Sequence, residues 1–395
     1  MNESITYDRL MRTAGTPGRR EVVRRILGMI RNGQLPSQGT FPSERKLSDM
    51  LNLSRPSLRL ALKALIELEI LYKLPGSNRW YIEVPPSLLN PKPSTIALIT
   101  STHEQHLHMS REEIGGRYHL SLHQAVTGYL QNGSRHILTL LYRELDSVSA
   151  DWLDQIGVNG LIVLNFNELK DDHSLILECH NRGIPVVVEG NDGWCRSFDR
   201  VYHDHEAGAK MLVHWLYERG CRKIMRVCWG SDEVYWRQMR HAGYLRALKE
   251  LGLAPLPVVR IDMGRPEDLE ADPSKRVQKL AEVLEPVLSE YLRGENAVDA
   301  IMADTDSHIY PIQCLARKLG RCPGEDIWFA GYDAFAPWAP EAQNRKDLLP
   351  HVSIDKQNEL IGIGLCQLLE KRLSGFSGET QVMTTAPRLV SYLDV

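Results

Sequence analysis

The sequence predicts an α/β protein in two parts, a small helical N-terminal module and a larger body of parallel sheets covered by helices. Three observations lead to this prediction. Apolar residues follow a helical period through most of residues 1–83, which end in two β-prone runs. Residues 84–94 contain four prolines and predict an extended linker. In residues 95–395, short apolar runs alternate with helical segments, which is typical of βαβ units.

The composition is that of an ordinary globular protein. The 395 residues are 43% hydrophobic and 25% charged, which excludes wholesale disorder, a collagen-like chain and a disulfide scaffold. No apolar run reaches 18 residues, so no membrane span is expected, and the polar segment Met1–Thr13 lacks the apolar core of a secretory signal. Seven cysteines, an odd number without a CxxC pair, favour reduced thiols and a cytoplasmic location.

Charge is divided unevenly along the chain. Residues 1–93 hold 15 lysines and arginines against 8 aspartates and glutamates, a net charge of +7, and the remaining residues carry −10. A basic module joined to an acidic body suggests that the module meets a polyanion. A basic segment can also be ordinary solvated surface, so charge alone leaves nucleic-acid binding open.

The basic module is expected to contain three helices and a hairpin. The first helix covers residues 20–32. Ser43 is a suitable N-cap for a short second helix, and Ser54 is a suitable N-cap for a third, after a tight turn at residues 52–53. Two β-prone runs, residues 70–74 and 79–84, follow and predict a hairpin.

The third helix has two distinct faces. Its apolar face is spaced for burial and consists of Leu58, Ala61, Leu62 and Leu65. Arg55, Arg59 and Lys63 recur every four residues and share another face. In a helix-turn-helix, the N-terminal residues of the second helix meet base edges in the major groove, and the arginine fork can bond guanine O6 and N7 together. A structural helical hairpin with surface arginines is the other reading.

The stretch GQLPSQGTFPSERKLSDMLNLSRPSLRLALKALIELEIL resembles the GntR-type winged helix-turn-helix. The resemblance implies binding to double-stranded DNA, with the hairpin as the wing. Two positions depart from the family pattern: Pro56 replaces a Thr or Ser, and Glu69 replaces a glycine before the wing. The DNA contacts that the resemblance implies fall on Arg45, Ser54, Arg55, Ser57, Arg59 and Gly76.

The body has seven short apolar runs of strand character. They are Ile96–Ile99, Ile137–Leu141, Leu161–Leu164, Val186–Val188, Ile224–Val227, Ala300–Met302 and Ile327–Ala330. A helical segment follows each run, so parallel sheets covered on both faces are expected.

Six weak motifs in the body occur in a consistent order. They are Val201–Asp204, Arg219–Ile224, Arg240–Leu248, Ala300–Asp306, Gly331–Asp333 and Ala386–Val390. The series resembles the effector domain of LacI/GalR-type repressors, whose fold is similar to periplasmic sugar-binding proteins. The resemblance implies two lobes, each with a parallel sheet, and a ligand bound in a cleft at the carboxyl ends of the strands.

The resemblance places effector contacts on Arg240, Asp306 and Asp333. Carboxylates and guanidinium groups suit a polyol, because each can bond two oxygens of a sugar. Trp194 and Trp236 are candidates for stacking on the ligand, with ordinary packing as the alternative. The histidine-containing segment 103–108 is expected at the mouth of the cleft, and whether it contacts the ligand is left open.

Signals for a metal, a cofactor or an enzyme are weak. His103-Glu-Gln-His106 is one residue short of the HExxH zinc pattern, and Gly362-Ile-Gly364 lacks the third glycine of a dinucleotide loop and suggests close helix packing instead. A P-loop and a G-x-S-x-G motif are absent, and no Cys–His nucleophile pair is evident from the spacing. The chain is therefore expected to have no metal or cofactor and not to be an enzyme.

Together, a GntR-type reader and a LacI-type sensor look like the arrangement in arabinose-type repressors. This resemblance implies a cytoplasmic homodimer that binds a near-palindromic operator and is released by a sugar or a related small metabolite. A nucleoside, a phosphorylated metabolite or a protein remain alternative effectors. The alternative function is a small-molecule-binding or catalytic α/β protein whose DNA binding is secondary.

Overall fold

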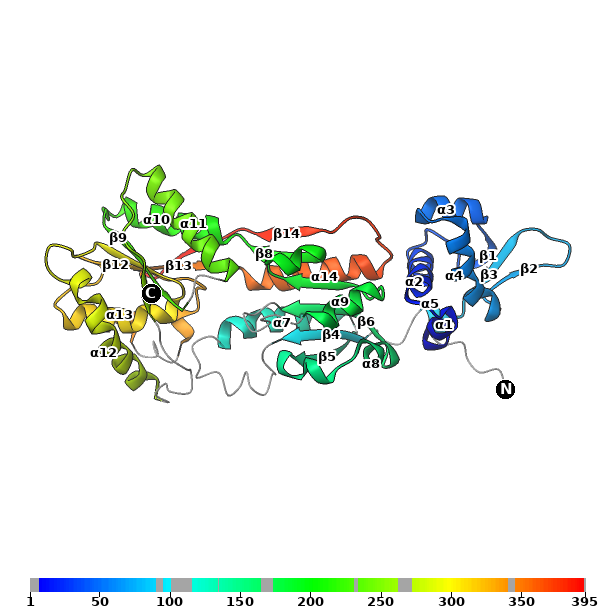
Figure 1. Ribbon diagram of the computed structural model, residues 1–395, viewed down its shortest axis with the longest axis horizontal. Helices are drawn as coiled ribbons and strands as arrows, with labels where there is room; N and C mark the ends of the chain where they lie inside the picture. The colour runs from blue at the N-terminus through cyan, green and yellow to red at the C-terminus, as the bar shows by residue number, and fades with distance from the viewer. Residues whose placement is uncertain are drawn as a thin grey trace. The chain divides into compact units, whose positions relative to one another are not determined.

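The structure is a computed structural model that describes residues 7–89, 95–100, 116–133, 135–164, 173–230, 234–261, 272–339 and 345–393. The described residues group into two compact units. The first unit contains an N-terminal domain and a first body domain, and the second unit contains a second body domain (Figure 1). The segment 103–108, predicted at the mouth of a cleft, lies outside the described residues.

The N-terminal domain has the predicted helix-turn-helix and hairpin. Its helices are α1 (Tyr7–Ala14), α2 (Pro17–Arg31), α3 (Glu44–Leu51) and α4 (Arg55–Glu67). The hairpin consists of β2 (Leu71–Lys73) and β3 (Trp80–Glu83), and β1 (Gln38–Phe41) pairs antiparallel with β3. The sequence does not predict β1, because only Phe41 of its four residues is buried and no apolar alternation results.

The predicted N-caps define both helices of the motif. The Ser43 hydroxyl accepts a hydrogen bond from the Lys46 N–H, and the Ser54 hydroxyl accepts one from the Ser57 N–H at 3.3 Å. Asn52 ends α3 in the left-handed region with φ 51°, a conformation that asparagine tolerates better than most residues. These local signals fix the angle at which α4 leaves the turn.

The first part of the predicted linker belongs to the N-terminal domain. The short helix α5 (Pro86–Leu89) follows β3, and the side chains of Val84 and Leu88 are buried in the N-terminal core. The Arg31 guanidinium donates to the Leu88 carbonyl at 3.1 Å. The chain therefore stays packed on this domain to the end of α5, and residues 90–94 lie outside the described part.

The first body domain is built on a six-stranded sheet of order β14-β8-β7-β6-β4-β5. The neighbouring pairs from β8 to β5 are parallel. The strands are β4 (Thr95–Thr100), β5 (His136–Leu141), β6 (Val158–Leu164), β7 (Val186–Glu189), β8 (Asp199–His203) and β14 (Val382–Thr385). Helices that accompany them are α7 (Gly116–Asn132), α8 (Ala150–Gln155), α9 (Ser174–Asn181) and α14 (Asn358–Leu373).

Close helix packing explains the Gly362-Ile-Gly364 sequence. A Cβ atom at Gly362 would lie 2.7 Å from Cβ of Ala125 on α7, so α14 and α7 approach more closely than a side chain would permit. On the sheet side, a Cβ atom at Gly160 of β6 would lie 2.8 Å from Cδ1 of Leu369 on α14. The prediction of close helix packing is confirmed at Gly362.

The second body domain has a six-stranded sheet of order β10-β9-β11-β12-β13-β15, in which only β15 is antiparallel to its neighbour. Its strands are β9 (Ile224–Trp229), β10 (Val259–Ile261), β11 (Ala300–Ala303), β12 (Trp328–Ala330), β13 (Val352–Asp355) and β15 (Arg388–Ser391). Its main helices are α10 (His205–Glu218), α11 (Tyr235–Glu250), α12 (Pro273–Leu292) and α13 (Asp306–Lys318).

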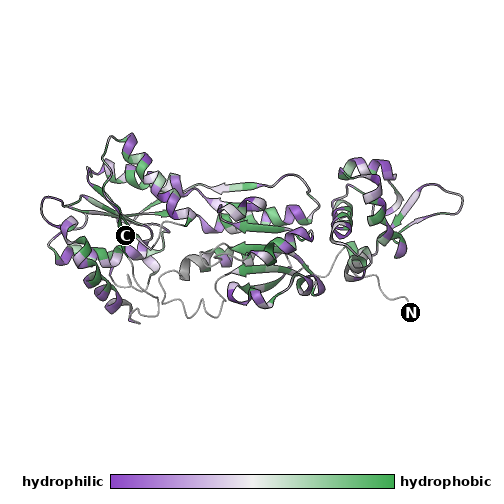
Figure 2. Cartoon of the chain, viewed as in Figure 1, coloured by the Kyte–Doolittle hydropathy of each residue, from purple (hydrophilic) through white to green (hydrophobic). Residues whose placement is uncertain are grey.

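Two separate apolar cores cover the two faces of this second sheet. One contains residues of α12 and α13, and the other contains residues of α10 and α11. Figure 2 shows the strands of the sheets as largely hydrophobic and much of the helical surface as hydrophilic. Among the described residues, no helix combines the length and apolar character needed to cross a membrane.

Candidate functional site

The outward face of α4 presents the residues that the sequence selects for DNA contact. Ser54, Arg55, Ser57 and Arg59 are all exposed at the start of the helix, and Arg45 is exposed on α3. The opposite face packs into the domain core through Leu58, Ala61, Leu62 and Leu65. The helix is thus held from behind while its cationic side chains remain available to a partner.

Contacts around the turn hold α2, α3 and α4 together. The Arg25 guanidinium of α2 donates to the Leu51 carbonyl at 2.7 Å, and the Ser48 hydroxyl donates to the Leu53 carbonyl. The Arg59 Nε lies 2.7 Å from Oε2 of Glu44, an ion pair that the sequence does not predict. Because the Arg59 side chain is 63% exposed, this pair contributes little stability and orients the guanidinium rather than burying it.

Gly76 lies in the turn of the hairpin, as the sequence predicts. Its φ of 75° is in the left-handed region that favours glycine, and the space around a Cβ at this position is open. The Lys73 ammonium of β2 lies 4.7 Å from the ring centre of Trp80 on β3, which joins the two strands below the turn. The wing is therefore a defined hairpin with an exposed glycine tip.

A second cluster of charged residues lies at the carboxyl ends of strands in the second body domain. Asp333 follows β12 and Lys356 follows β13, and Arg240 comes from α11. The Asp333 Oδ1 is 3.3 Å from Arg240 Nη2 and 2.7 Å from Lys356 Nζ. The side chains are 2% (Arg240), 12% (Asp333) and 7% (Lys356) exposed, so water screens their charges weakly. The sequence predicts Arg240 and Asp333 but misses Lys356, whose only signal is its position after a strand.

Aromatic rings surround the Arg240 guanidinium. It lies 3.5 Å from the ring centre of Tyr332 and 4.4 Å from that of Trp236, one helical turn earlier on α11. Burial lowers the pKa of His205 well below its usual value, so its neutral imidazole Nδ1 accepts the Arg240 Nε–H at 3.4 Å. Arg240 is thereby fixed in one orientation, and Trp236, a predicted effector contact, lies beside it.

Asp333 is ionised and conformationally constrained. Burial would raise the pKa of Asp333, but the Lys356 ammonium and the Arg240 guanidinium outweigh burial and lower this pKa to about 2. Asp333 and Ala334 have φ values of 86° and 50°, which are unusual for residues other than glycine. Such strain persists where surrounding contacts enforce it and is concentrated at functional sites.

The contacts that enforce this turn come from Asp306, the first residue of α13. The Ser353 hydroxyl donates to Asp306 Oδ1 at 2.6 Å and itself accepts the Ala334 N–H at 3.1 Å. The Ala336 N–H donates to Asp306 Oδ2 at 3.0 Å. A Cβ at Gly331 would lie 2.1 Å from Asp306 Oδ1, so only glycine permits this approach.

These contacts favour a positioning role for Asp306 over the predicted effector contact. Its side chain is 0% exposed and both of its oxygens are hydrogen-bonded within the protein. The position after a strand is visible in the sequence, but the direction in which the carboxylate points is not. Asp306 positions the turn that carries Asp333.

The pH dependence of stability is expected to report on Asp306. Burial raises the pKa of Asp306 to about 8, although the Ser353 hydroxyl acts in the opposite direction. The unfolded chain loses this proton near pH 4, so the folded state binds one proton more between the two pKa values, and stability falls as pH rises toward 8. We expect the free energy of unfolding to fall between pH 7 and 8, by up to about 1.4 kcal/mol per pH unit. Urea denaturation at a series of pH values measures it.

Asp306→Asn provides the comparison, because its amide does not ionise in this pH range and keeps an oxygen that can accept the Ala336 N–H. The variant should fold and should lack this fall between pH 7 and 8. Parallel pH profiles of the wild type and Asp306→Asn would show that Asp306 is ionised in the folded state.

A buried ionic cluster lies next to this site. Asp304, one residue beyond β11, is 1% exposed. Its carboxylate lies 2.7 Å from Arg226 Nη2 and 3.3 Å from Arg237 Nε, and the Asp304 carbonyl accepts a hydrogen bond from Arg240. The sequence does not single out these residues, because Arg226 interrupts an otherwise apolar strand and reads as a surface position. The cluster holds α11, and with it Arg240, against the sheet.

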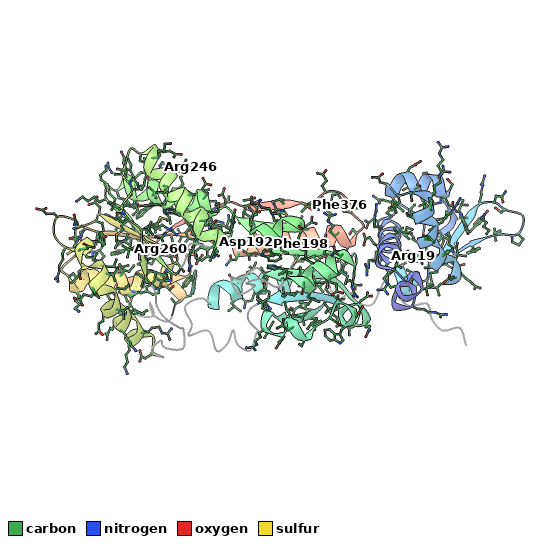
Figure 3. All side chains as sticks on the ribbon, in the orientation of Figure 1. Arg19, Asp192, Phe198, Arg246, Arg260 and Phe376 are labelled. Carbon is green, nitrogen blue, oxygen red and sulfur yellow. The ribbon has the colours of Figure 1, made fainter. Side chains whose placement is uncertain are left out.

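Trp194 has a different location from the other predicted effector residues. It lies in the first body domain, where its ring stacks on His173 with 4.1 Å between the ring centres. The centre of the Phe198 ring, a residue labelled in Figure 3, lies 6.0 Å from that of Trp194 in an edge arrangement. Trp194 is partly buried against the core of that domain. These contacts favour the packing alternative for Trp194.

A comparison with known protein families matches the N-terminal domain. Residues 19–78 match the family of bacterial regulatory proteins of the gntR type, which covers α2 to the turn of the hairpin. This match agrees with the resemblance in the sequence and identifies the N-terminal domain as a GntR helix-turn-helix. No protein with a curated description matches the chain significantly.

Most of the chain has the fold of solved LacI-type regulators. The transcriptional regulator CelR, in complex with cellobiose, covers 88% of this chain and 98% of its own, with 18% identity and a TM-score of 0.57. A LacI-family regulatory protein from Chloroflexus aggregans covers 75% and 97%, with 21% identity and a TM-score of 0.55. A putative ribose operon repressor from Burkholderia thailandensis covers 75% and 98%, with 16% identity and a TM-score of 0.54. At these identities the similarity establishes the fold.

Proposed function

We propose that this chain, with a GntR-type DNA-binding domain at residues 19–78 and a body with the fold of LacI-type regulators, is a transcription regulator whose DNA binding is controlled by a small molecule. The observation that carries the proposal is that one chain has both an exposed cationic helix, α4, and a charged cluster at the strand ends of an α/β sheet. Ligands bind at such strand ends in open α/β proteins.

The effector site that we propose consists of Arg240, Asp333, Lys356 and Trp236. A carboxylate can accept two hydroxyl groups, the guanidinium and the ammonium donate to oxygens, and the indole face covers C–H surface. This chemistry fits a sugar or a related polyol. Cellobiose in the CelR complex and D-xylulofuranose in a similar periplasmic-binding-protein/LacI-type structure from Alkaliphilus metalliredigens are sugars bound to this fold.

The same proposal includes a homodimer that represses transcription from a near-palindromic operator in the cytoplasm. Two copies of α4 related by a two-fold axis would contact two half-sites of the operator. Two linked DNA-binding domains bind such an operator more tightly than one domain alone. The role proposed for the body is regulation and not catalysis.

The effector site is tested by Asp333→Asn, which removes the charge and keeps the shape. A screen of neutral sugars and sugar phosphates by thermal shift should identify a compound that raises the melting temperature of the wild type. At a concentration of 100 Kd, such a ligand adds about 2.7 kcal/mol to stability. Asp333→Asn should lose this shift at the same concentration.

Asp347→Asn serves as the control, because this carboxylate pairs with Arg345 on the surface of the same domain and is 44% exposed. It should respond to the compound as the wild type does. An unchanged shift in Asp333→Asn would place the effector elsewhere.

A further inference from the structure

The outward face of α4 carries an exposed leucine among its cationic residues. Leu60 is 40% exposed, and Pro56, one helical turn earlier, is also exposed. The two lie on the same side of the helix because residues four apart share a face. Arg59 and Lys63 flank Leu60 and are exposed as well. An apolar strip therefore runs along the part of α4 that carries the cationic side chains.

We infer that Leu60 recognises a thymine in the major groove by contact with the C5-methyl group of the base. This inference rests on the proposed function. Of the four bases, thymine alone presents an apolar group there, and apolar side chains recognise it by contact with this methyl. The surrounding cations select a polyanion as the partner of this face, and phosphates give a leucine no favourable contact. The inference concerns sequence preference, whereas Arg55 and Arg59 supply affinity and guanine contacts.

A single exposed leucine on a protein surface needs no explanation by itself. Leu60 differs because of its position, in the second turn of the helix whose N-terminal part meets base edges. Pro56, which replaces the Thr or Ser of the family pattern, supports the same inference. Its side chain has no hydrogen-bonding group for a base edge and extends the apolar surface toward the start of α4. The two residues together form a surface that suits a methyl group better than an amide or a carbonyl.

The same helix supplies a matched control in Ile66. This residue is 39% exposed, nearly the same as Leu60, and it lies near the end of α4. Six residues of helix separate the two, which corresponds to about 9 Å along the axis. Ile66 is therefore equally apolar and exposed but lies away from the N-terminal turns that read bases.

The experiment uses full-length protein and DNA in which thymines are replaced one at a time by deoxyuridine, which removes only the methyl group. The protein first selects its preferred duplex from a random library, and fluorescence anisotropy then measures the affinity for each substituted duplex. At one or two thymines per half-site the wild type should bind deoxyuridine DNA about fourfold more weakly, the value of one buried methyl group. Leu60→Ala should bind both duplexes equally, and Ile66→Ala should keep the fourfold difference.

Two results would overturn the inference while leaving DNA binding intact. The first is a wild type that binds thymine and deoxyuridine DNA equally at every position. The second is a Leu60→Ala variant that retains the preference, or that changes only the association state of the protein in sedimentation, which would assign Leu60 to a protein interface. Failure of the wild type to select any duplex would overturn the proposed function as well.

Discussion

Replacing Asp304 with alanine is expected to lower the free energy of unfolding by about 3–5 kcal/mol, because it removes the carboxylate shared by the buried Arg226 and the partly buried Arg237. Arg226 is fully buried in the middle of β9, and Arg237 is 16% exposed on α11. Taking away the negative partner of a buried charge costs far more than the pair contributes when intact. Urea denaturation followed by tryptophan fluorescence measures the change.

Glu285→Ala is the matched control for this prediction. Glu285 pairs with Lys318 at 2.5 Å in the same domain, but the two side chains are 35% and 57% exposed. Solvent screens such a pair, so its loss should cost less than about 1 kcal/mol. Equal costs for Asp304→Ala and Glu285→Ala would mean that the Asp304 cluster is hydrated in solution.

Arg55→Ala and Arg59→Ala are each expected to weaken binding to the selected DNA by about 1–3 kcal/mol, which corresponds to a loss of roughly 5- to 150-fold. Both arginines lie in the first two turns of α4 and point away from the core. Because neither side chain is buried, melting temperatures should stay close to that of the wild type. Fluorescence anisotropy at physiological salt measures the affinity.

The control is Arg246→Ala on α11. Its side chain is 64% exposed, nearly the same as the 63% of Arg59, and it too pairs with a glutamate, Glu206, at 2.5 Å. Arg246→Ala should leave DNA affinity unchanged. If both α4 variants bind as tightly as the wild type, another element makes the DNA contacts.

Local signals explain why the helix-turn-helix could be predicted from the sequence. Serine caps at positions 43 and 54 and an apolar face on α4 determine the motif within about 25 residues of chain. Seven strands of the body were also predictable, because strands covered on both faces form nearly continuous apolar runs. Some strands of three to five residues that include polar or charged side chains carry little pattern and were not predicted. They are β1, β8, β10, β13, β14 and β15.

The proposed effector site could be predicted only in part. The resemblance to the LacI/GalR effector domain implies Arg240 and Asp333, but Lys356 joins them from the end of a strand far away in the chain. The resemblance also implies an effector contact at Asp306, but the sequence leaves the direction of a side chain open. In the structure the Asp306 carboxylate is hydrogen-bonded to Ser353 and Ala336, which favours a positioning role. The Asp304 cluster depends on β9, β11 and α11 coming together, which no local pattern encodes.

Control of DNA binding by a small molecule is tested most directly by one affinity, that of the full-length protein for its selected duplex, measured with and without the compound that raises its melting temperature. A regulator of the proposed kind should show a change of about 5- to 150-fold at saturating compound, the usual range of coupling between two sites, with weaker binding expected for a repressor. Linkage requires that the duplex change the affinity for the compound by the same factor. Identical DNA affinities with and without saturating compound would contradict the proposed regulation.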